Sequence, residues 1–182
     1  MNDRVRYSDQ VLEPKTIECL NRYFNEDPRF WKEKSDNANM KLHIDGWFTK
    51  AGKNADVHSI DFKHYGYYAD GDHSIDGKFY AEVLTTSFDD RQVKGSLYGQ
   101  QEYFLLAPSW TSWYFVKRKD LQEYIEARVD MSSEPIETSQ LMTLAKSKRM
   151  GGVIVYFDPL ELPSEVKLHH IPNLFDYFNV HV

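Results

Sequence analysis

The sequence predicts a fold that mixes helices and strands (α/β or α+β) in a single domain spanning residues 1–182. Its length of 182 residues fits one domain. Hydrophobic residues make up 41% of the chain and aromatic residues 15%, which is enough for one packed core and excludes a disordered chain. The hydrophobic periodicity indicates a helix, a run of strands, a second helix and a last strand. This order is typical of a mixed sheet.

Two amphipathic helices are expected, over residues 14–24 and 120–128. The first has apolar residues three and four positions apart, at Ile17, Leu20 and Phe24. Pro14 suits its first turn, and the helix is expected to end before residue 25. In the second helix, Asp120 stands where an N-cap residue is expected.

Alternation of apolar and polar side chains predicts the strands. Met40, Leu42 and Ile44 alternate with polar residues, which predicts a strand over residues 40–48. Further strands are expected over residues 57–65, 78–86, 102–107, 113–116 and 152–157, with a turn at 108–109. The segment 91–101 is ambiguous, because Gly95 and Gly99 weaken a helix. Residues 159–182 contain too many prolines for one long helix.

Composition excludes several classes of protein. The single cysteine cannot form an internal disulfide, and no group of residues has zinc-ligand spacing. No stretch approaches 18 apolar residues and the N-terminus is polar, so neither a membrane span nor a signal peptide is expected. No glycine-rich phosphate loop is present, so no nucleotide cofactor is expected. These features predict a soluble protein of a reducing compartment, the cytoplasm.

The charge is unevenly distributed. A net charge of −6 argues against a protein held to nucleic acid mainly by phosphate contacts. Residues 1–90 contain 17 acidic and 12 basic residues, whereas residues 91–149 contain 7 and 9, with basic runs at 117–119 and 146–149. The acidic half could hold divalent cations while the basic runs meet a polyanion. Solvated surface is at least as good an interpretation of each run alone.

The candidate chemistry lies in the expected hairpin that contains Asp45, Asp61 and Lys63. Asp61 and Lys63 are two residues apart on one strand and therefore point to the same face. Antiparallel pairing brings Asp45 near Asp61, and two converging carboxylates repel unless a cation lies between them. Their hard oxygens suit Mg²⁺, which lowers the pKa of a bound water and neutralises charge on a phosphate. Lys63 would orient or help deprotonate that water, or stabilise the transition state.

This pattern resembles the PD-(D/E)XK nuclease superfamily. The matching residues are Ile44–Asp45, fourteen intervening residues, and Ile60–Lys63; Ile44 replaces the proline of the family's name, and Asp61 replaces the more frequent glutamate. The resemblance is to compact phage-type and resolvase-like members. It implies a restriction-endonuclease-like central mixed sheet flanked by helices over about residues 10–128. Residues 129–182 would then be a C-terminal extension packed on this core, and the source a phage or mobile element, with the host cytoplasm as location.

The same resemblance implies an Mg²⁺-dependent endodeoxyribonuclease that hydrolyses phosphodiester bonds in DNA, with Mn²⁺ able to replace Mg²⁺. Asp45 and Asp61 would bind the metal, the backbone carbonyl of Phe62 would add a ligand, and Lys63 would act on the attacking water. Such nucleases commonly work as dimers when they cut two strands, so a homodimer is implied as well. Lesser candidates are Glu82, Glu18 and Gln101 near the metal or phosphate, and Lys94, Lys117, Arg118 and Lys119 for nucleic-acid binding.

Several polar residues also have a simpler interpretation. Glu82 is equally well a salt-bridged strand residue, Glu18 part of a solvated helix face, and Gln101 an ordinary loop residue. His58 alternates away from Asp61 and is expected on the opposite face of the strand. Cys19 belongs to the apolar side of its helix and is not expected to act as a nucleophile.

Two other functions stay open at this point. The chain could be a non-catalytic module that binds nucleic acid or another protein, with a degenerate or coincidental nuclease motif. It could also be a nuclease with the same site that acts on RNA. Metal dependence separates the first of these from a nuclease, and substrate competition between DNA and RNA separates the second.

Overall fold

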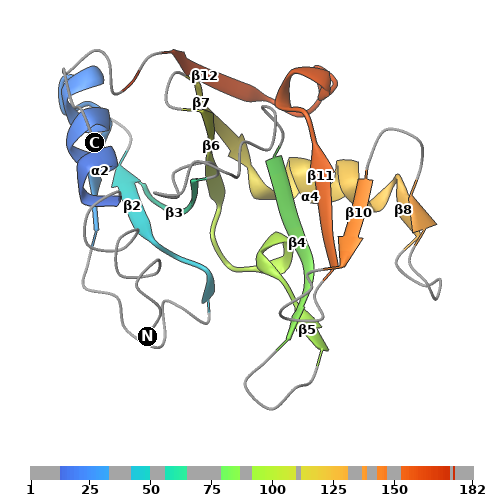
Figure 1. Cartoon of the computed structure of the whole chain (residues 1–182). Coiled ribbons are helices and arrows are strands. Elements are labelled where there is room, and N and C mark those ends of the chain that lie inside the picture. Colours follow the sequence, from blue (N-terminus) through green and yellow to red (C-terminus); the bar gives the residue numbers. More distant parts are fainter. Residues whose placement is uncertain are drawn as a thin grey trace, which may run out of the picture.

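The structure, a computed structural model, describes residues 13–32, 42–49, 56–64, 79–86, 92–109, 112–130, 137–138, 143–146, 153–172 and 174. These residues form a six-stranded sheet, a four-stranded sheet, a two-stranded ribbon and two α-helices (Figure 1). The expected mixture of helices and strands is therefore confirmed. Neither helix of this described part is long and apolar enough to cross a membrane.

The six-stranded sheet carries the candidate residues. Its strands, in spatial order, are β1 (Arg29–Trp31), β2 (Gly46–Thr49), β3 (Val57–His64), β6 (Tyr103–Ser109), β7 (Ser112–Lys117) and β12 (Leu168–Pro172). The pair β3–β6 is parallel, with Asp61 opposite Phe104, and the other pairs are antiparallel. The predicted mixed sheet is thus observed. Gly46 pairs with Ile60, so β2 and β3 form the hairpin expected around Asp45 and Asp61.

A second sheet takes two of its strands from the connection between β3 and β6 and two from residues beyond 128. It contains β4 (Phe79–Thr86), β5 (Gln92–Lys94), β10 (Thr143–Lys146) and β11 (Val153–Phe157), in the order β10-β11-β4-β5. The ambiguous segment 91–101 consists, in its described part, of β5 followed by the short 3₁₀ helix η2 (Ser96–Tyr98). No α-helix occurs among the described residues of this connection.

Residues beyond 128 contribute strands to both sheets. β11 pairs with β4, and β12 pairs with β7. The remaining short elements are β8 (Val129–Asp130), which pairs with β9 (Glu137–Thr138), and η3 (Pro159–Glu161). The described strands β11 and β12, from the segment expected to be an extension packed on the core, therefore lie within the two sheets.

Two hydrophobic clusters lie on opposite faces of the six-stranded sheet. On one face, Ile60 and Phe62 of β3 pack with Cys19 and Leu20 of α2 (Glu13–Tyr23). The other cluster joins Phe104 and Leu106 of β6 to residues of β4 and β11 and to α4 (Arg118–Glu126). Figure 1 shows α2 at one side of the molecule and α4 behind β11. Since Asp61 pairs with Phe104 and Lys63 with Leu106, this acid and lysine point toward the second cluster.

Three boundaries differ from the sequence prediction. The strand predicted over residues 40–48 is wrong in its described first half, because Leu42 belongs to a helical turn and His43 has a positive φ of 55°. The strand begins only at Gly46. The second helix begins at Arg118 with Lys117 as N-cap, so Asp120 lies inside its first turn, where a negative charge favours the helix dipole. β6 runs through the predicted turn at 108–109 to Ser109.

Candidate active site

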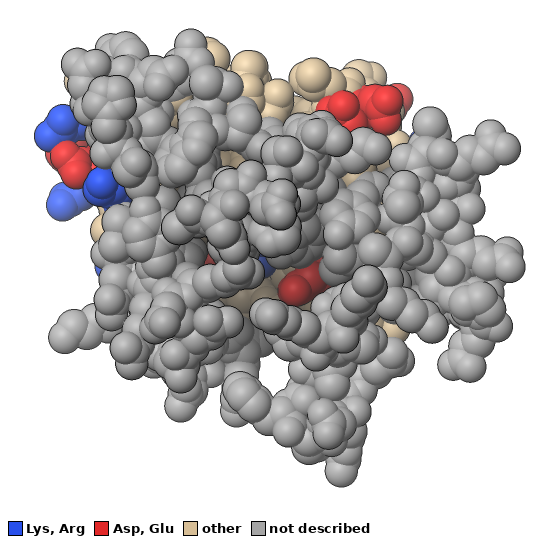
Figure 2. Space-filling model, viewed as in Figure 1, with Lys and Arg blue, Asp and Glu red and all other residues tan. Residues whose placement is uncertain are grey.

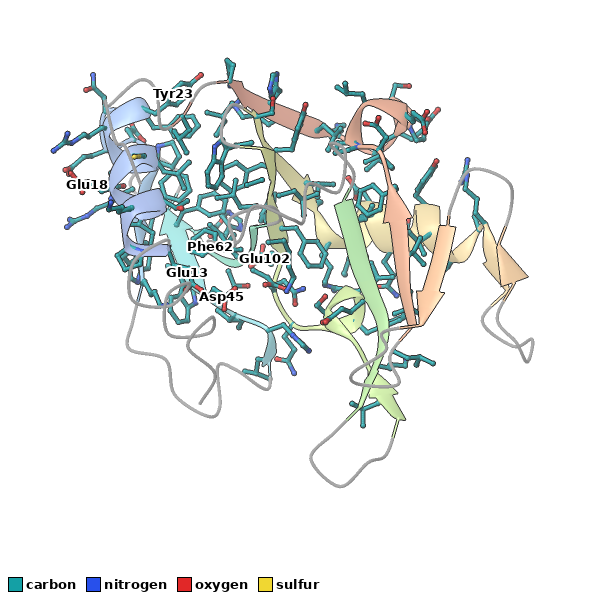
Figure 3. All side chains as sticks on the ribbon, in the orientation of Figure 1. Glu13, Glu18, Tyr23, Asp45, Phe62 and Glu102 are labelled. Atoms are coloured by element: carbon teal, nitrogen blue, oxygen red, sulfur yellow. The ribbon has the colours of Figure 1, made fainter. Side chains whose placement is uncertain are left out.

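Asp45 lies directly before β2 and is held against the edge of β3. Its backbone amide donates to the carbonyl of Ile60 over 2.9 Å. Its side-chain Oδ2 accepts a hydrogen bond of 2.9 Å from the backbone amide of Phe62. The carboxylate thus continues the β2–β3 ladder past the point where β2 begins. In Figure 3 Asp45 and Phe62 lie close together between α2 and β4.

Asp61 and Lys63 form a buried ion pair on β3. The Nζ of Lys63 lies 2.8 Å from Oδ1 of Asp61, and the two side chains are 17% and 2% exposed. The second carboxylate oxygen, Oδ2 of Asp61, is buried and has no hydrogen-bond partner among the described residues. An unpaired carboxylate oxygen in a buried position is costly and favours binding of a proton or a cation there.

Opposing influences act on the pKa of the Asp61 carboxyl. Burial raises the pKa well above its usual value, Lys63 lowers it, and the neighbouring Asp45 carboxylate raises it again. The net direction is upward. The approach of the two acids predicted from the hairpin is therefore present, and it produces the expected repulsion.

Lys63 is held in its charged form. Burial alone lowers the pKa of this ammonium, but the charges of Asp61, Glu82 and Asp45 outweigh burial and raise it above its usual value. Lys63 is therefore a hydrogen-bond donor at neutral pH. A charged ammonium has no lone pair to accept a proton, so the raised pKa favours the expected roles of orienting a water or stabilising a transition state, and the role in deprotonating a water stays a prediction.

The backbone carbonyl of Phe62 lies at the same edge as Asp45. Along a strand, alternate residues direct their amide and carbonyl groups to the same neighbour. The carbonyl of Ser59 accepts from the amide of Glu102 on the β6 side, whereas that of Ile60 accepts from Asp45 on the β2 side. Phe62 follows Ile60 in this alternation, so its carbonyl and Asp45 share one edge of β3.

The oxygen atoms that approach one another at this edge are of the type that Mg²⁺ prefers. They comprise the carboxylates of Asp45 and Asp61 and the carbonyl of Phe62, all hard oxygen ligands, with the unpaired Oδ2 of Asp61 among them. In the described part of the chain, no group of three or more His, Cys, Asp or Glu residues could hold a metal ion. Mg²⁺ in general binds through one or two carboxylates, retained waters and substrate phosphate.

Glu82 of β4 belongs to the surroundings of this site. Its charge acts on both Lys63 and His43, and its side chain is half-buried. Gly95 contacts β4 next to Glu82, and its amide donates a 2.9 Å hydrogen bond to the carbonyl of Val83. A Cβ at Gly95 would collide with the backbone of Glu82, so this close approach requires glycine. In Figure 2 acidic and basic atoms are visible near the centre of the view.

Two of the lesser candidates lie elsewhere. The side chain of Glu18 is 59% exposed and pairs with Arg22 over 2.8 Å, and Figure 3 shows it on the outer side of α2. Glu18 thus lies on a solvated helix face, the simpler interpretation of this residue. Gln101 is fully buried, and its Nε2 donates to the carbonyl of Ser96 over 2.6 Å. Gln101 therefore stabilises the start of η2 through this hydrogen bond.

The basic candidates divide into two groups. Lys94, Lys117 and Lys119 are exposed, with the Lys94 ammonium 4.8 Å from the centroid of the Tyr98 ring. Arg118, by contrast, is half-buried: its Nε donates to the carbonyl of Gln101 over 2.9 Å, and its Nη1 donates to Leu97 and Gln122. Burial lowers the pKa of this guanidinium. These internal bonds give Arg118 a structural role that the basic run did not predict.

Sequence reasoning missed His43. It lies two residues before Asp45, and the charges of Lys63, Glu82 and Asp45 all act on its ring. Burial is the largest influence and, together with Lys63, lowers the pKa of the imidazole. The signal available in the sequence was the shared parity of His43 and Asp45.

His58 lies on the opposite face from Asp61, as predicted. Its ring is tilted against that of Phe48 at a centroid distance of 5.0 Å, and its Nδ1 lies 2.7 Å from Oε2 of Glu102. Cys19 is buried, and burial together with Glu18 raises the pKa of its thiol to about 11. Neither residue belongs to the site around Asp61.

No family model, no curated protein and no solved structure matches this chain. The site is therefore interpreted from its own geometry.

Proposed function

We propose that the protein is a metal-dependent nuclease of the PD-(D/E)XK type that hydrolyses phosphodiester bonds in DNA. One observation carries the proposal. Asp61 and Lys63 form a buried ion pair on one strand, with a second carboxylate, Asp45, at the edge of that strand. Burying two acids and a lysine together costs stability, and such groups gather where chemistry requires them.

The metal would be Mg²⁺, or Mn²⁺ in its place, held by Asp45, Asp61 and the carbonyl of Phe62. When bound, such an ion supplies a water of lowered pKa and positive charge for a phosphate oxygen. The protein's own contribution is to hold the ligands in place. Asp45 is oriented by the amide of Phe62, and Asp61 is oriented by Lys63.

Lys63 would act as a donor in this mechanism. Its ammonium is fixed by Asp61 and stays charged, so it can donate to the attacking water or to a phosphate oxygen. Negative charge grows on the phosphate oxygens as the bond to the nucleophile forms. A pre-positioned ammonium in a largely buried site stabilises that charge without reorganisation.

Around the strand of Asp61 the fold supports the proposal, but one connection differs from the restriction-endonuclease-like arrangement. A helix precedes the hairpin, and the strand of Asp61 lies in a mixed sheet next to a parallel neighbour, β6. Where the restriction-endonuclease-like arrangement has a helix after the motif strand, the described residues here form β4, β5 and η2. This second sheet brings Glu82 to the site, a position from which an acid can assist.

Substrate and assembly follow as parts of the same proposal. Exposed Lys94, Lys117 and Lys119 offer phosphate contacts for DNA, and a homodimer would allow both strands of a duplex to be cut.

The test is cleavage of plasmid, linear, branched and single-stranded DNA and of RNA, each in Mg²⁺, Mn²⁺ and EDTA. The variants are Asp61→Asn and Lys63→Met, with Glu18→Gln as a control that also removes one acid but lies on the outer side of α2. Cutting is expected in either metal, absent in EDTA, lost in both site variants and retained in the control.

A wild-type protein that cuts none of these substrates would overturn the proposal in favour of a non-catalytic binding module. Cutting that survives both site substitutions would assign the activity to other residues. Preference for RNA over every DNA would retain the site and change the substrate.

A further inference from the structure

His43 has an unusual backbone conformation for its residue type. Its φ is 55°, in the left-handed region, where a residue with a Cβ is strained by about 1–2 kcal/mol. Asn25 and Glu26 also have positive φ, but they lie in the turn that ends α2. Strained residues persist where the surrounding structure over-determines them, and they concentrate at functional sites.

The surroundings of His43 supply that constraint. The carbonyl of the preceding residue, Leu42, accepts a 3.0 Å hydrogen bond from the amide of Gln100. The adjacent Gly99 leaves room for the histidine, since a Cβ there would lie 3.0 Å from the Cβ of His43 and would also collide with the Gln101 side chain. The segment after η2 is thus fitted against His43, with a glycine at the point of contact.

His43 is half-buried, and charges of the candidate site act on its imidazole. Lys63, Asp45 and Glu82 act on it from β3, from the start of β2 and from β4. Three of the charged groups gathered here, Asp45, Asp61 and Glu82, are acids that repel a phosphate, and the ammonium of Lys63 already bonds to Asp61. An imidazole retains at least one N–H donor in either protonation state. His43 therefore adds a donor where a polyanionic substrate needs one.

We propose that His43 contacts the substrate of this site, its imidazole N–H donating a hydrogen bond to a non-bridging oxygen of the phosphodiester that is cut. The proposal rests on the nuclease function proposed above and assigns a further residue to it. The strain in the backbone is then maintained because the left-handed turn brings the ring to the reacting phosphate.

The competing role is structural, with histidine merely tolerated in a left-handed turn. Glycine at position 43 separates the two roles, because it adopts positive φ without strain. If His43 contacts substrate, His43→Gly folds, keeps its melting temperature within a few degrees, and loses about 100-fold in kcat, the effect of deleting one transition-state donor. Added imidazole restores part of the rate, since the missing ring leaves space for it.

The experiment compares wild type, His43→Gly, His43→Asn and Lys63→Met on the preferred substrate, with and without imidazole, beside thermal unfolding of each. Asparagine also tolerates positive φ, so His43→Asn is expected to fold, to lose activity and to gain nothing from imidazole. Lys63→Met controls for non-specific stimulation and is expected to stay inactive in imidazole.

Each outcome decides one question. A wild-type protein without activity overturns the nuclease function, and this inference with it. An active wild type together with a His43→Gly variant of equal kcat overturns only the role of His43. So does a His43→Gly variant that fails to fold, because its side chain is then required by the fold itself. Activity that falls in His43→Gly and returns with imidazole supports the contact.

Discussion

Replacing Lys63 with methionine should make the stability of this protein strongly dependent on pH. The substitution keeps the length and apolar stem of the side chain and removes the charge that lies 2.8 Å from Asp61. Burial and Asp45 already raise the pKa of Asp61, and Lys63 is the influence that lowers it. Without the ammonium, protonating Asp61 costs the folded state less free energy than burying an unpaired carboxylate.

The magnitude follows from that proton. Holding a carboxyl of ordinary pKa about 3.9 neutral at pH 7 costs roughly 4 kcal/mol, at 1.36 kcal/mol per pH unit. The free energy of unfolding of Lys63→Met can therefore fall by at most this amount at pH 7. The value agrees with the roughly 3–5 kcal/mol lost when one partner of a buried ion pair is removed. At pH 5 the same cost is only about 1.5 kcal/mol.

The sign is set by proton binding. A carboxyl whose pKa is higher in the folded than in the unfolded state keeps its proton on folding, so its stabilising effect is present at low pH and is lost as pH rises. Lys63→Met should therefore be close to wild type at pH 4 and increasingly destabilised toward pH 8.

Urea unfolding in EDTA at pH 5, 6, 7 and 8 measures this directly, since no divalent cation can then replace the lost charge. The matched control is the double variant Asp61→Asn/Lys63→Met, which removes both charges and should be the more stable of the two variants at pH 8. A cost that is the same at pH 5 and pH 8, or a double variant as unstable as the single one, would refute the argument that Asp61 is buried beside Asp45 with Lys63 as its balancing charge.

Three further predictions concern residues that support the site. Gly95→Ala should cost about 1–3 kcal/mol in thermal unfolding, because the new Cβ meets the backbone of Glu82; a neutral substitution would contradict this close packing. Arg118→Met should cost about 2 kcal/mol in urea unfolding by leaving the carbonyls of Leu97 and Gln101 without their donor, and equal loss in Lys119→Met, an exposed neighbour, would assign the effect to charge alone. Cys19, with its pKa raised to about 11, should react with iodoacetamide at pH 8 only after denaturation, and rapid labelling of the native protein would show that its helix does not cover it.

The local part of the site could be predicted from the sequence. Asp61 and Lys63 share a face because strand geometry sends alternate residues to the same side, and the structure places them in direct contact. The hairpin that brings Asp45 to β3 also follows from two short alternating segments joined by a loop. These features depend on periodicity alone, and neighbours in one strand or one hairpin are bound to meet.

Other features of the site depend on contacts that periodicity does not contain. His43 shares the parity of Asp45, but it lies in a left-handed turn that contacts Gly99 and Gln100, more than fifty residues away. The basic run at 117–119 predicts three exposed side chains, but only Lys117 and Lys119 are exposed. The guanidinium of Arg118 instead donates hydrogen bonds to backbone carbonyls near η2.

The sequence by itself thus determined the mixture of helices and strands, the strand with its acid and lysine on one face, and the approach of a second acid. The tertiary structure decided how deeply that pair is buried, that Lys63 remains charged, and that Glu82 and His43 join it while Glu18 does not. The physical reason is that side-chain direction within a strand is a local property of the backbone. Burial and the electric field at a side chain are sums over elements far apart in the sequence, here β3, β4 and the segment around η2.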